Sequence, residues 1–401
     1  MKVLSIVGTR PEAIKLAPVV RALRHRGVEA VVCLTGQHRE MLVDSLPQLG
    51  LRADIELSGL YSGQTINQTI GAAMGALDAM LAQVRPDRVL VQGDTTTALA
   101  GSLAAFNRQI PVAHVEAGLR THDPRRPWPE ETNRRAIDVV CDLLFAPTER
   151  ARDNLERENL AGRIFVTGNT GIDAVREAAR RLRREAELRR AIDATLPALT
   201  PGKRLVLVTG HRRESFGPRL LEVCSALKIL SRRDDVEVLY ALHLNPEIEG
   251  PVRRALGDRR NIRLAPPQSY LAFVRLLQRC HLVVTDSGGV QEEAPALAKP
   301  VVVTRTETER SEALTAGGAQ LVGTDSAAIL HAVERLLDDP AHYARRAVRR
   351  LPFGDGRASE RIVDALLGRP VAEFKTPSAR APRAPAAAPS EAVLDGRTFL
   401  A

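Results

Sequence analysis

Short apolar runs alternate with helical stretches along almost the whole chain, and this alternation constrains the fold more than any other feature. The runs lie near residues 2–7, 28–34, 88–92, 111–115, 141–146 and 163–167, and again near 204–209, 236–241, 261–264, 281–285, 300–304 and 319–322. Runs such as 205–208 are continuously apolar, which is typical of strands buried on both faces of a parallel sheet. The pattern predicts an α/β fold with two doubly wound, Rossmann-like domains that face a cleft.

The length of the chain, 401 residues, exceeds what one compact core usually organises and suits two domains. A charged helical stretch near 176–190 and a segment with two prolines near 196–202 bracket the expected linker. Beyond Gly368 the composition turns to Ala, Pro and Arg, which cannot build a core. We expect a first domain over residues 1–170, a second over 171–356, a helix over 357–368 that completes the first, and a disordered tail over 369–401.

The net charge of +9 favours anionic partners in general, and much of the arginine lies in residues 176–190. Glu177, Glu185 and Glu187 are interleaved with these arginines, which is the pattern of a solvated helix face with i,i+4 ion pairs. Aromatic residues make up 3% of the chain, and none accompanies this stretch to stack on bases. We therefore expect an anionic small substrate and no nucleic acid.

The four cysteines, Cys33, Cys141, Cys224 and Cys280, are far apart and have no metal-ligand spacing. This spacing favours buried thiols in a reducing compartment over a metal site or a disulfide framework. The first residues enter a strand without a signal-peptide pattern, and no apolar run approaches the length of a membrane span. We expect a cytoplasmic protein that contacts no membrane and holds no metal.

An anion site is predicted where the first apolar run ends, in the segment from Gly8 to Lys15, GTRPEAIK. The first N–H groups of a helix lack intrahelical partners and carry the positive end of its dipole, and Arg10 and Lys15 add charge there. A phosphate group is the natural ligand. The alternative is an ordinary strand-to-helix turn with two solvated cations.

The first half offers three carboxylates, Asp94, Glu116 and Glu130. Asp94 and Glu116 come directly after apolar runs, and Glu130 comes on the next loop. In open α/β sheets the ligand lies beyond the carboxyl ends of the strands, so all three are offered to one cleft. Each alone could be a helix cap or an ion-pair partner. Together they indicate acid/base chemistry.

The second half supplies the complementary charge. The turn Asp286-Ser287-Gly288-Gly289 joins an apolar run to a helix and lets backbone N–H groups approach a phosphate closely. Glu293, one turn into that helix, could bind ribose hydroxyls, and an arginine-rich segment, 305–310, follows the next run. These features predict a nucleotide diphosphate site opposite the carboxylates.

Nine motifs occur in order over residues 1 to about 368: GTRPEAIK, TGQHREM, QGDTTT, HVEAGLRT, PWPEE, TGHRRESFG, HLNP, TDSGGVQEEAP and RTETER. On these motifs the chain resembles the bacterial non-hydrolysing UDP-N-acetylglucosamine 2-epimerases, which have a GT-B-like fold. It departs from them at Ser311, where proline is usual, at His122, where glycine is usual, and in the additional tail.

The resemblance implies an isomerase that interconverts UDP-N-acetylglucosamine and UDP-N-acetylmannosamine, supplies N-acetylmannosamine units for cell-surface polysaccharide, and forms a homodimer. The C2 hydrogen of the sugar is not next to a carbonyl, so direct deprotonation is not a plausible route. The sequence has no G-x-G-x-x-G fingerprint, which argues against a nicotinamide cofactor that would oxidise C3. Elimination of UDP to a 2-acetamidoglucal and its re-addition needs only carboxylates near C2 and cations around the diphosphate. We expect no cofactor.

The resemblance also assigns residues. It implies catalytic roles for Asp94, Glu116, Glu130 and His211, without saying which carboxylate acts on which face of C2. It implies substrate binding by Arg10, Lys15, Phe273, Ser287, Gly288, Gly289, Glu293 and Arg310, with Glu293 at the ribose and Phe273 at the uracil. A second UDP-N-acetylglucosamine would act as an allosteric activator beside Gln37, His38, Gln64, Arg212 and His243.

Three other functions are open to the same sequence. A GT-B glycosyltransferase would share the fold and the diphosphate site but would need an acceptor, and it has less use for three carboxylates. A hydrolysing epimerase would share the first step and release free sugar and UDP. A regulator that only binds nucleotide sugars would keep Ser287 to Glu293 and would not need the carboxylates.

Overall fold

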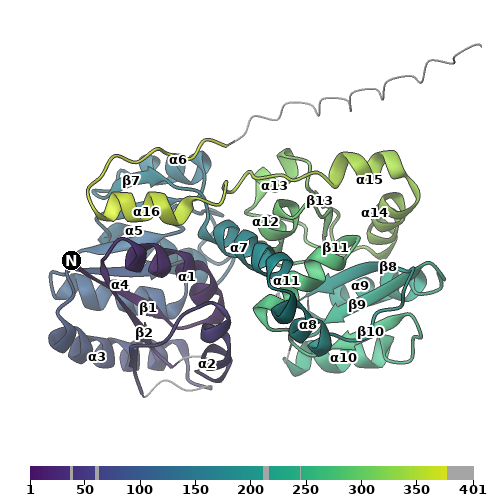
Figure 1. Cartoon of the computed structure of the whole chain (residues 1–401), viewed down its shortest axis with the longest axis horizontal. Helices are drawn as coiled ribbons and strands as arrows, with labels where there is room; N and C mark the ends of the chain where they lie inside the picture. The colour runs from purple at the N-terminus through teal and green to yellow at the C-terminus, as the bar shows by residue number, and fades with distance from the viewer. Residues whose placement is uncertain (37–38, 59–62, 211–215, 244, 377–401) are drawn as a thin grey trace, which may run out of the picture.

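A computed structural model of the chain describes residues 1–36, 39–58, 63–210, 216–243 and 245–376, and it contains two parallel sheets with helices packed on them (Figure 1). The first sheet has the strand order β3-β2-β1-β4-β5-β6-β7, and the second has the order β10-β9-β8-β11-β12-β13. The strands of the first are β1 (Lys2–Val7), β2 (Glu29–Leu34), β3 (Ile55–Glu56), β4 (Arg88–Gln92), β5 (Val112–Val115), β6 (Leu143–Ala146) and β7 (Arg163–Val166). Those of the second are β8 (Arg204–Thr209), β9 (Val236–Ala241), β10 (Ile262–Ala265), β11 (Leu282–Thr285), β12 (Val301–Val303) and β13 (Ala319–Leu321).

The helices follow the strands in alternation. The first half contains α1 (Arg10–His25), α2 (Arg39–Gln48), α3 (Ile66–Val84), α4 (Thr96–Asn107), α5 (Glu130–Val140), α6 (Glu149–Arg157) and α7 (Thr170–Arg184). The second contains α8 (Ala186–Thr195), α9 (Pro218–Leu230), α10 (Pro246–Leu256), α11 (Tyr270–Arg279), α12 (Gly288–Ala296), α13 (Ser311–Thr315), α14 (Ser326–Asp338) and α15 (Pro340–Arg346), and α16 (Ala358–Leu366) follows. This is the predicted α/β architecture with two doubly wound sheets.

The apolar runs became strands because both of their faces are covered. All four residues of Leu205–Val208 in β8 are buried, as their continuous apolar character predicts. Strand β3 was not predicted, because its two residues, one half-buried and one exposed, are too few to form a pattern. In both sheets the chain order reverses beside the first strand, β1 or β8, so the ends of these strands open onto crevices where ligands bind.

The charged stretch 176–190 forms parts of two helices, α7 and α8, that meet at Glu185. One side of α7 is buried and packs on α1, α11 and α12, although its composition suggested only a solvated face. Figure 1 shows α7 between the two halves of the molecule. The division at residues 170 and 356 stays a prediction.

The end of the chain returns to the first sheet, where α16 packs on α1 and α7 (Figure 1). The carboxylate of Asp173 accepts hydrogen bonds from Ser359 N at 2.8 Å, Ser359 Oγ at 2.6 Å and Ala358 N at 3.1 Å. Since the α16 backbone donates to a buried carboxylate of α7, this return is fixed by polar contacts as well as by packing.

The expected disorder of the tail is wrong for residues 369–376. Phe374 is buried, its N–H donates to Val166 O at 2.8 Å, and the Arg361 guanidinium lies 5.8 Å from the centre of its ring. The side chain of Glu373 accepts from Val166 N at 3.1 Å. These contacts attach residues 373 and 374 to the edge of the first sheet beside β7. The Ala/Pro-rich composition of the tail as a whole gave no indication that Phe374 anchors them. Residues 377–401 lie outside the described ranges.

All four cysteines are buried and unpaired, as predicted. Burial raises the pKa of Cys33 and of Cys280 to about 12 and that of Cys224 to about 11. Within the described ranges, no helix combines the length and the apolar character that crossing a bilayer would require.

Candidate active site

The turn between β1 and α1 is held by a glutamate. The carboxylate of Glu12 accepts from Gly8 N at 3.0 Å, from Thr9 N at 2.6 Å and from Thr95 Oγ1 at 2.7 Å. Burial raises the pKa of Glu12 to about 7. A Cβ at Gly8 would collide with Thr97, so only glycine allows this close approach to the loop after β4. The Gly8 and Thr9 amides are therefore already occupied, and an anion here would depend on Arg10, Lys15 and the helix dipole.

Glu116 lies at the end of β5 and receives three donors. Its Oε2 atom accepts from Lys15 Nζ and from Gln92 Nε2, the latter at 2.6 Å, and its Oε1 atom accepts from Arg310 Nη2 at 3.3 Å. The side chain is 4% exposed. The backbone of Glu116 has φ 72°, in the left-handed region that non-glycine residues seldom adopt. Such strain is found where the surrounding structure requires one side-chain direction.

Arg310 belongs to the second half and reaches this cluster from the segment before α13. Its Nε atom donates to Glu292 Oε1 at 2.9 Å and its Nη1 atom to Glu309 Oε1 at 2.8 Å. Burial alone would lower the pKa of Arg310, but the carboxylates of Glu309, Glu292 and Glu116 raise it. Burial likewise opposes the charge of Lys15, and Glu116 and Glu292 raise its pKa. The side chains of Lys15 and Arg310 therefore stay positively charged where the two halves meet.

Asp94 follows β4 and forms an ion pair with Arg134 of α5. Burial alone would raise the pKa of Asp94, but Arg134 holds it below its ordinary value, so the group is ionised at neutral pH. Arg134 is oriented in turn by Glu131 Oε2 at 3.2 Å, and Asn133 Nδ2 donates to the Asp94 carbonyl at 2.9 Å. Three residues in the first half of α5, Glu131, Asn133 and Arg134, therefore set the place of Asp94.

Glu130 is the first residue of α5 and is half-buried. Its Oε2 atom is buried and has no hydrogen-bond partner among the described residues. A buried carboxylate oxygen without a donor is costly, which is why such an atom marks a place where a ligand is expected.

A buried histidine joins the ends of β4 and β5. His114 Nδ1 lies 2.6 Å from Asp138 Oδ1, and His114 Nε2 lies 2.7 Å from Gly93 O. Asp138 also accepts from Arg120 Nη2 at 2.7 Å, and the neighbouring cations hold its pKa low although burial would raise it. Each ring nitrogen of His114 therefore lies within hydrogen-bond distance of an acceptor. His114 fixes the carbonyl immediately before Asp94, a role that sequence patterns did not reveal.

The second half contributes the N-terminus of α12. Ser287 is its N-cap residue, and Ser287 N donates to Thr285 Oγ1 at 2.9 Å. A Cβ added to Gly289 would meet open space, so the first turn of α12 is accessible. Glu293 lies on the next turn and is half-buried, and burial raises its pKa to about 8, with Glu292 acting in the same direction. The N-terminus of α12 and Glu293 are therefore neighbours at the accessible start of this helix.

Arg10 of the first half interacts electrostatically with Glu293 of the second, which lowers the pKa of that carboxyl against the larger effect of burial. Burial lowers the pKa of Arg10 itself. Tyr270, the first residue of α11, is buried, and its hydroxyl has no hydrogen-bond partner within the described ranges. Burial raises its pKa, Glu293 acts in the same direction and Arg10 opposes it. Phe273, one turn further along α11, is half-buried.

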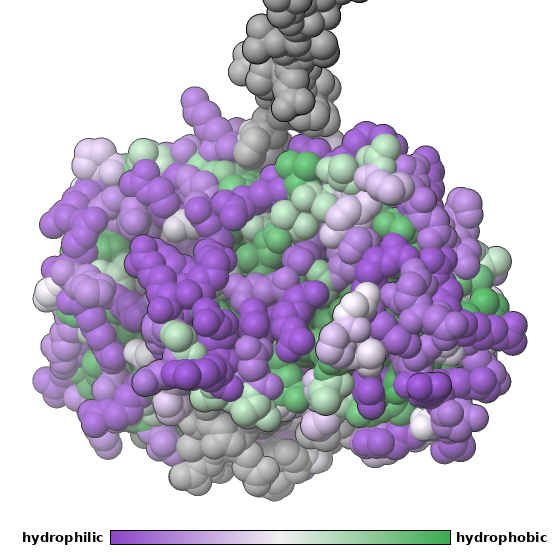
Figure 2. Space-filling model, turned by 45° about the vertical axis from the view of Figure 1, so that its right-hand side comes forward, coloured by the Kyte–Doolittle hydropathy of each residue, from purple (hydrophilic) through white to green (hydrophobic). Residues whose placement is uncertain are grey.

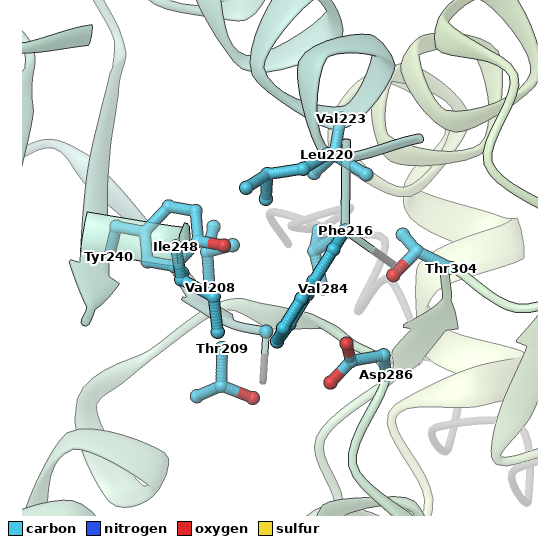
Figure 3. A pocket seen from close by; sticks show the side chains of 11 residues that line it. Val208, Thr209, Phe216, Leu220, Val223, Tyr240, Ile248, Val284, Asp286 and Thr304 are labelled. Carbon is cyan, nitrogen blue, oxygen red and sulfur yellow. The ribbon is translucent and has the colours of Figure 1, made fainter. Parts of the chain in front are cut away.

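A small cavity of about 10 Å³ lies beneath Gly210, at the end of β8 (Figure 3). The buried hydroxyl of Tyr240 has no partner among the described residues, and Figure 3 shows it on the same side of the cavity as Val208. The volume of the cavity matches about one water molecule.

Four of the remaining predicted residues lie outside the described ranges: Gln37, His38, His211 and Arg212. Gln64 and His243 are described, and their grouping as an activator site stays a prediction.

Two departures from the usual motifs have structural consequences. His122 has φ 65°, a conformation that glycine adopts without strain, and its N–H donates to Glu131 Oε1 at 3.2 Å. Ser311 begins α13, where proline would also fit, and its hydroxyl accepts from Arg150 of α6. Beside it, Thr148 Oγ1 donates to Glu312 Oε1 at 2.9 Å. These contacts add to the links between the halves.

The arrangement therefore combines carboxylates with fixed cations. Asp94, Glu116 and Glu130 follow strands of the first sheet, and Lys15, Arg10 and Arg310 place positive charge between that sheet and α12. Such a site can move protons at one part of a ligand and stabilise a departing anion at another. No group of His, Cys, Asp or Glu side chains among the described residues is placed to hold a metal ion.

Comparisons with known proteins agree with this architecture. The sequence model of the UDP-N-acetylglucosamine 2-epimerase family matches residues 21–367. The UDP-N-acetylglucosamine 2-epimerase of Escherichia coli K12 is 49% identical over 369 residues, which are 91% of this chain and 98% of that protein. The crystal structure of the UDP-GlcNAc 2-epimerase of Neisseria meningitidis, bound to UDP-GlcNAc, superposes with a TM-score of 0.87 at 40% identity, covering 92% of this chain and 100% of that one. The enzyme from Methanocaldococcus jannaschii, in complex with UDP-GlcNAc and UDP, superposes with a TM-score of 0.79 at 33% identity, with coverage of 92% and 100%.

Proposed function

The chain belongs to the UDP-N-acetylglucosamine 2-epimerase family, and we propose that it epimerises UDP-N-acetylglucosamine at C2 without net hydrolysis, giving UDP-N-acetylmannosamine. The observation that carries the proposal is the cluster in which Lys15 and Arg310 both contact Glu116. It brings a proton-transfer group and two diphosphate-binding cations together from both halves of the molecule.

The reaction proceeds by elimination and re-addition. A carboxylate removes the C2 proton, the electrons of that C–H bond form a double bond between C1 and C2, and the C1–O bond breaks with its electron pair leaving on UDP. Protonation of the 2-acetamidoglucal on the opposite face of C2, with return of UDP to C1, gives the epimer. No redox partner is needed, because the oxidation level of the sugar is unchanged.

The carboxylates Asp94, Glu116 and Glu130 act at the sugar. Asp94 suits a base because Arg134 keeps it ionised. The unpartnered oxygen of Glu130 is free to accept a proton or a sugar hydroxyl. Which carboxylate acts on which face of C2 stays open. His211, by its family position, assists the leaving diphosphate.

The nucleotide is held by both halves. Arg10, Arg310 and the α12 N-terminus at Ser287, Gly288 and Gly289 bind the phosphates, and Lys15 adds charge beside them. With a pKa of about 8, Glu293 carries a proton at neutral pH, so it can both donate to and accept from ribose hydroxyls. Phe273 lies at the uracil.

Several further assignments rest on family resemblance. They are a homodimer, activation by a second UDP-N-acetylglucosamine at Gln37, His38, Gln64, Arg212 and His243, and supply of N-acetylmannosamine units for polysaccharide. The four buried free thiols support a cytoplasmic location.

Proton NMR of the purified protein with UDP-N-acetylglucosamine in deuterated water tests the mechanism. Deuterium should enter C2 of both epimers while UDP stays attached at equilibrium. Stoichiometric free UDP would indicate a hydrolysing epimerase. Retention of protium at C2 with epimerisation would exclude elimination. The absence of any turnover without an added acceptor would favour a glycosyltransferase, and tight UDP binding without chemistry would favour a regulator.

A further inference from the structure

A second cavity, of about 580 Å³, lies along the last turns of α1, and its walls come from α1, α7, α16, the end of α12 and the segment after α15. None of the described substrate-site residues lines it. Arg10 and His25 mark the two ends of α1, about 22 Å apart by the rise of a helix. The cavity at the His25 end is therefore separate from the site described above. Its volume is in the range of small-molecule sites.

Three arginines line this cavity from one side of α7. Arg176, Arg180 and Arg183 follow the i, i+4, i+7 spacing that places side chains in one row. Like charges at this spacing destabilise a helix. Hydrophilic residues cover much of the face shown in Figure 2. Arg176 is half-buried and Arg180 and Arg183 are exposed, so their guanidinium groups can be reached by an anion from solvent.

The nearby carboxylates do not compensate the charge of these arginines. Glu177 is paired with Arg21, and Glu360 with Arg357 at 2.9 Å. Asp173 accepts three hydrogen bonds from the start of α16, and burial raises its pKa.

A fourth arginine, Arg349, enters the cavity from the segment after α15. Among the described residues, no carboxylate forms an ion pair with Arg176, Arg180, Arg183 or Arg349. Four uncompensated guanidinium groups thus line a single cavity.

We propose that this cavity is a binding site for a compact oligophosphate anion with three or more phosphate groups. Guanidinium groups donate paired hydrogen bonds that match phosphate oxygens, and four of them balance the charge of a triphosphate. The cavity is bounded on several sides by helices, which suits a small anion better than an extended polymer. Because Arg180 lies on α7 and Arg349 in the segment after α15, the bound anion contacts both halves of the chain.

Calorimetric titration of the full-length protein with inorganic triphosphate, with UDP present at saturation to block the substrate site, tests the proposal. One triphosphate should bind per chain. The double variant R180Q/R183Q should weaken binding about tenfold or more, since two charge-assisted contacts are lost. R349Q alone should weaken it several-fold. The control R184Q/R190Q removes the same charge from exposed positions of α7 and α8 outside the cavity and should change the affinity less than twofold.

Each other outcome overturns the proposal. No binding in the presence of UDP would show that the anion uses only the substrate site. An equal loss in R184Q/R190Q would show diffuse attraction to a basic surface, and preference for a single-stranded oligonucleotide over triphosphate would point to nucleic acid. An unchanged affinity in R349Q would show that the segment after α15 does not contact the anion, so the anion would not be enclosed between that segment and α7. Melting temperatures of R180Q/R183Q and R349Q at or above that of the parent protein exclude misfolding as the cause.

Discussion

Arg310 Nη2 lies 3.3 Å from Glu116 Oε1, so a guanidinium of the second half contacts a carboxylate at the end of β5 in the first. Arg310 is also bound to Glu292 and Glu309, and both side chains of the Glu116 contact are less than a tenth exposed. A diphosphate that binds Arg310 competes with these carboxylates. Substrate binding and the freeing of Glu116 for proton transfer are therefore expected to occur together.

The division of labour between the halves predicts opposite effects of two substitutions. Asp94→Asn keeps the size of the side chain and removes proton transfer, so turnover should fall by about 10² or more while UDP affinity changes little. Glu293→Ala should instead weaken UDP binding by roughly 1 to 3 kcal/mol through lost hydrogen bonds. Calorimetry with UDP and an epimerisation assay measure both. Loss of UDP binding in Asp94→Asn as large as in Glu293→Ala would contradict the assignment.

The raised pKa of Glu293 predicts a pH dependence of stability. In the folded protein the pKa of Glu293 is about 8, above its ordinary value of about 4.5. Between these two pH values the folded state binds more protons than the unfolded state, so the free energy of unfolding falls as the pH rises. Glu293→Gln cannot ionise and should lose less stability than the parent between pH 6 and 9. Urea denaturation at both pH values measures the difference. Equal losses in the two proteins would show that Glu293 titrates normally.

His114 should act by positioning Asp94. His114→Gln cannot contact both Asp138 and Gly93 in the same geometry, so the turn before Asp94 should shift and turnover should fall by about tenfold to 10². UDP affinity and KM should change little, because the nucleotide is bound elsewhere. A loss of turnover that merely tracks the fraction of unfolded protein would mean that His114 only stabilises the fold.

His122 offers a stabilising substitution. His122→Gly should raise the free energy of unfolding by up to about 1 kcal/mol, because glycine adopts φ 65° without strain. The matched control is His331→Gly at an exposed position of α14, which should lower stability by about 1 kcal/mol. Thermal denaturation of both variants gives the two signs. A destabilised His122→Gly would show that the histidine side chain makes a contact that outweighs the strain.

Residues 369–376 pack on the first sheet, and we expect residues 377–401 to add nothing to stability. Removing residues 377–401 should leave the melting temperature unchanged, since an Ala/Pro-rich segment buries little. Phe374→Ala should destabilise by about 3 kcal/mol, because a buried aromatic ring is lost from the edge of the first sheet. Calorimetric melting of the two proteins separates the parts. Equal stability of Phe374→Ala and the parent would mean that the docked segment adds nothing to the fold.

The sequence predicted the features that depend on periodicity and on strand ends. Parallel strands present their carboxyl ends at one edge, so it was predictable that Asp94 and Glu116 would lie near the same cations, Lys15 and Arg310. The roles of Glu12 and His114 were not, because they depend on partners that only the packed structure supplies. Glu292 was missed for a different reason: successive helical residues differ by about 100° in direction, and sequence alone did not show which of two glutamates faces Arg310.

The return of the chain to the first sheet also sets an order for biosynthesis. Asp173 and the edge of β7 acquire their partners only from residues 358–374, which leave the ribosome after the whole second half. The second sheet contains all of its strands within one continuous stretch, residues 204–321, and can assemble as it emerges. The first half therefore completes its fold last, although it is synthesised first, and its closing contacts span some 200 residues of intervening chain.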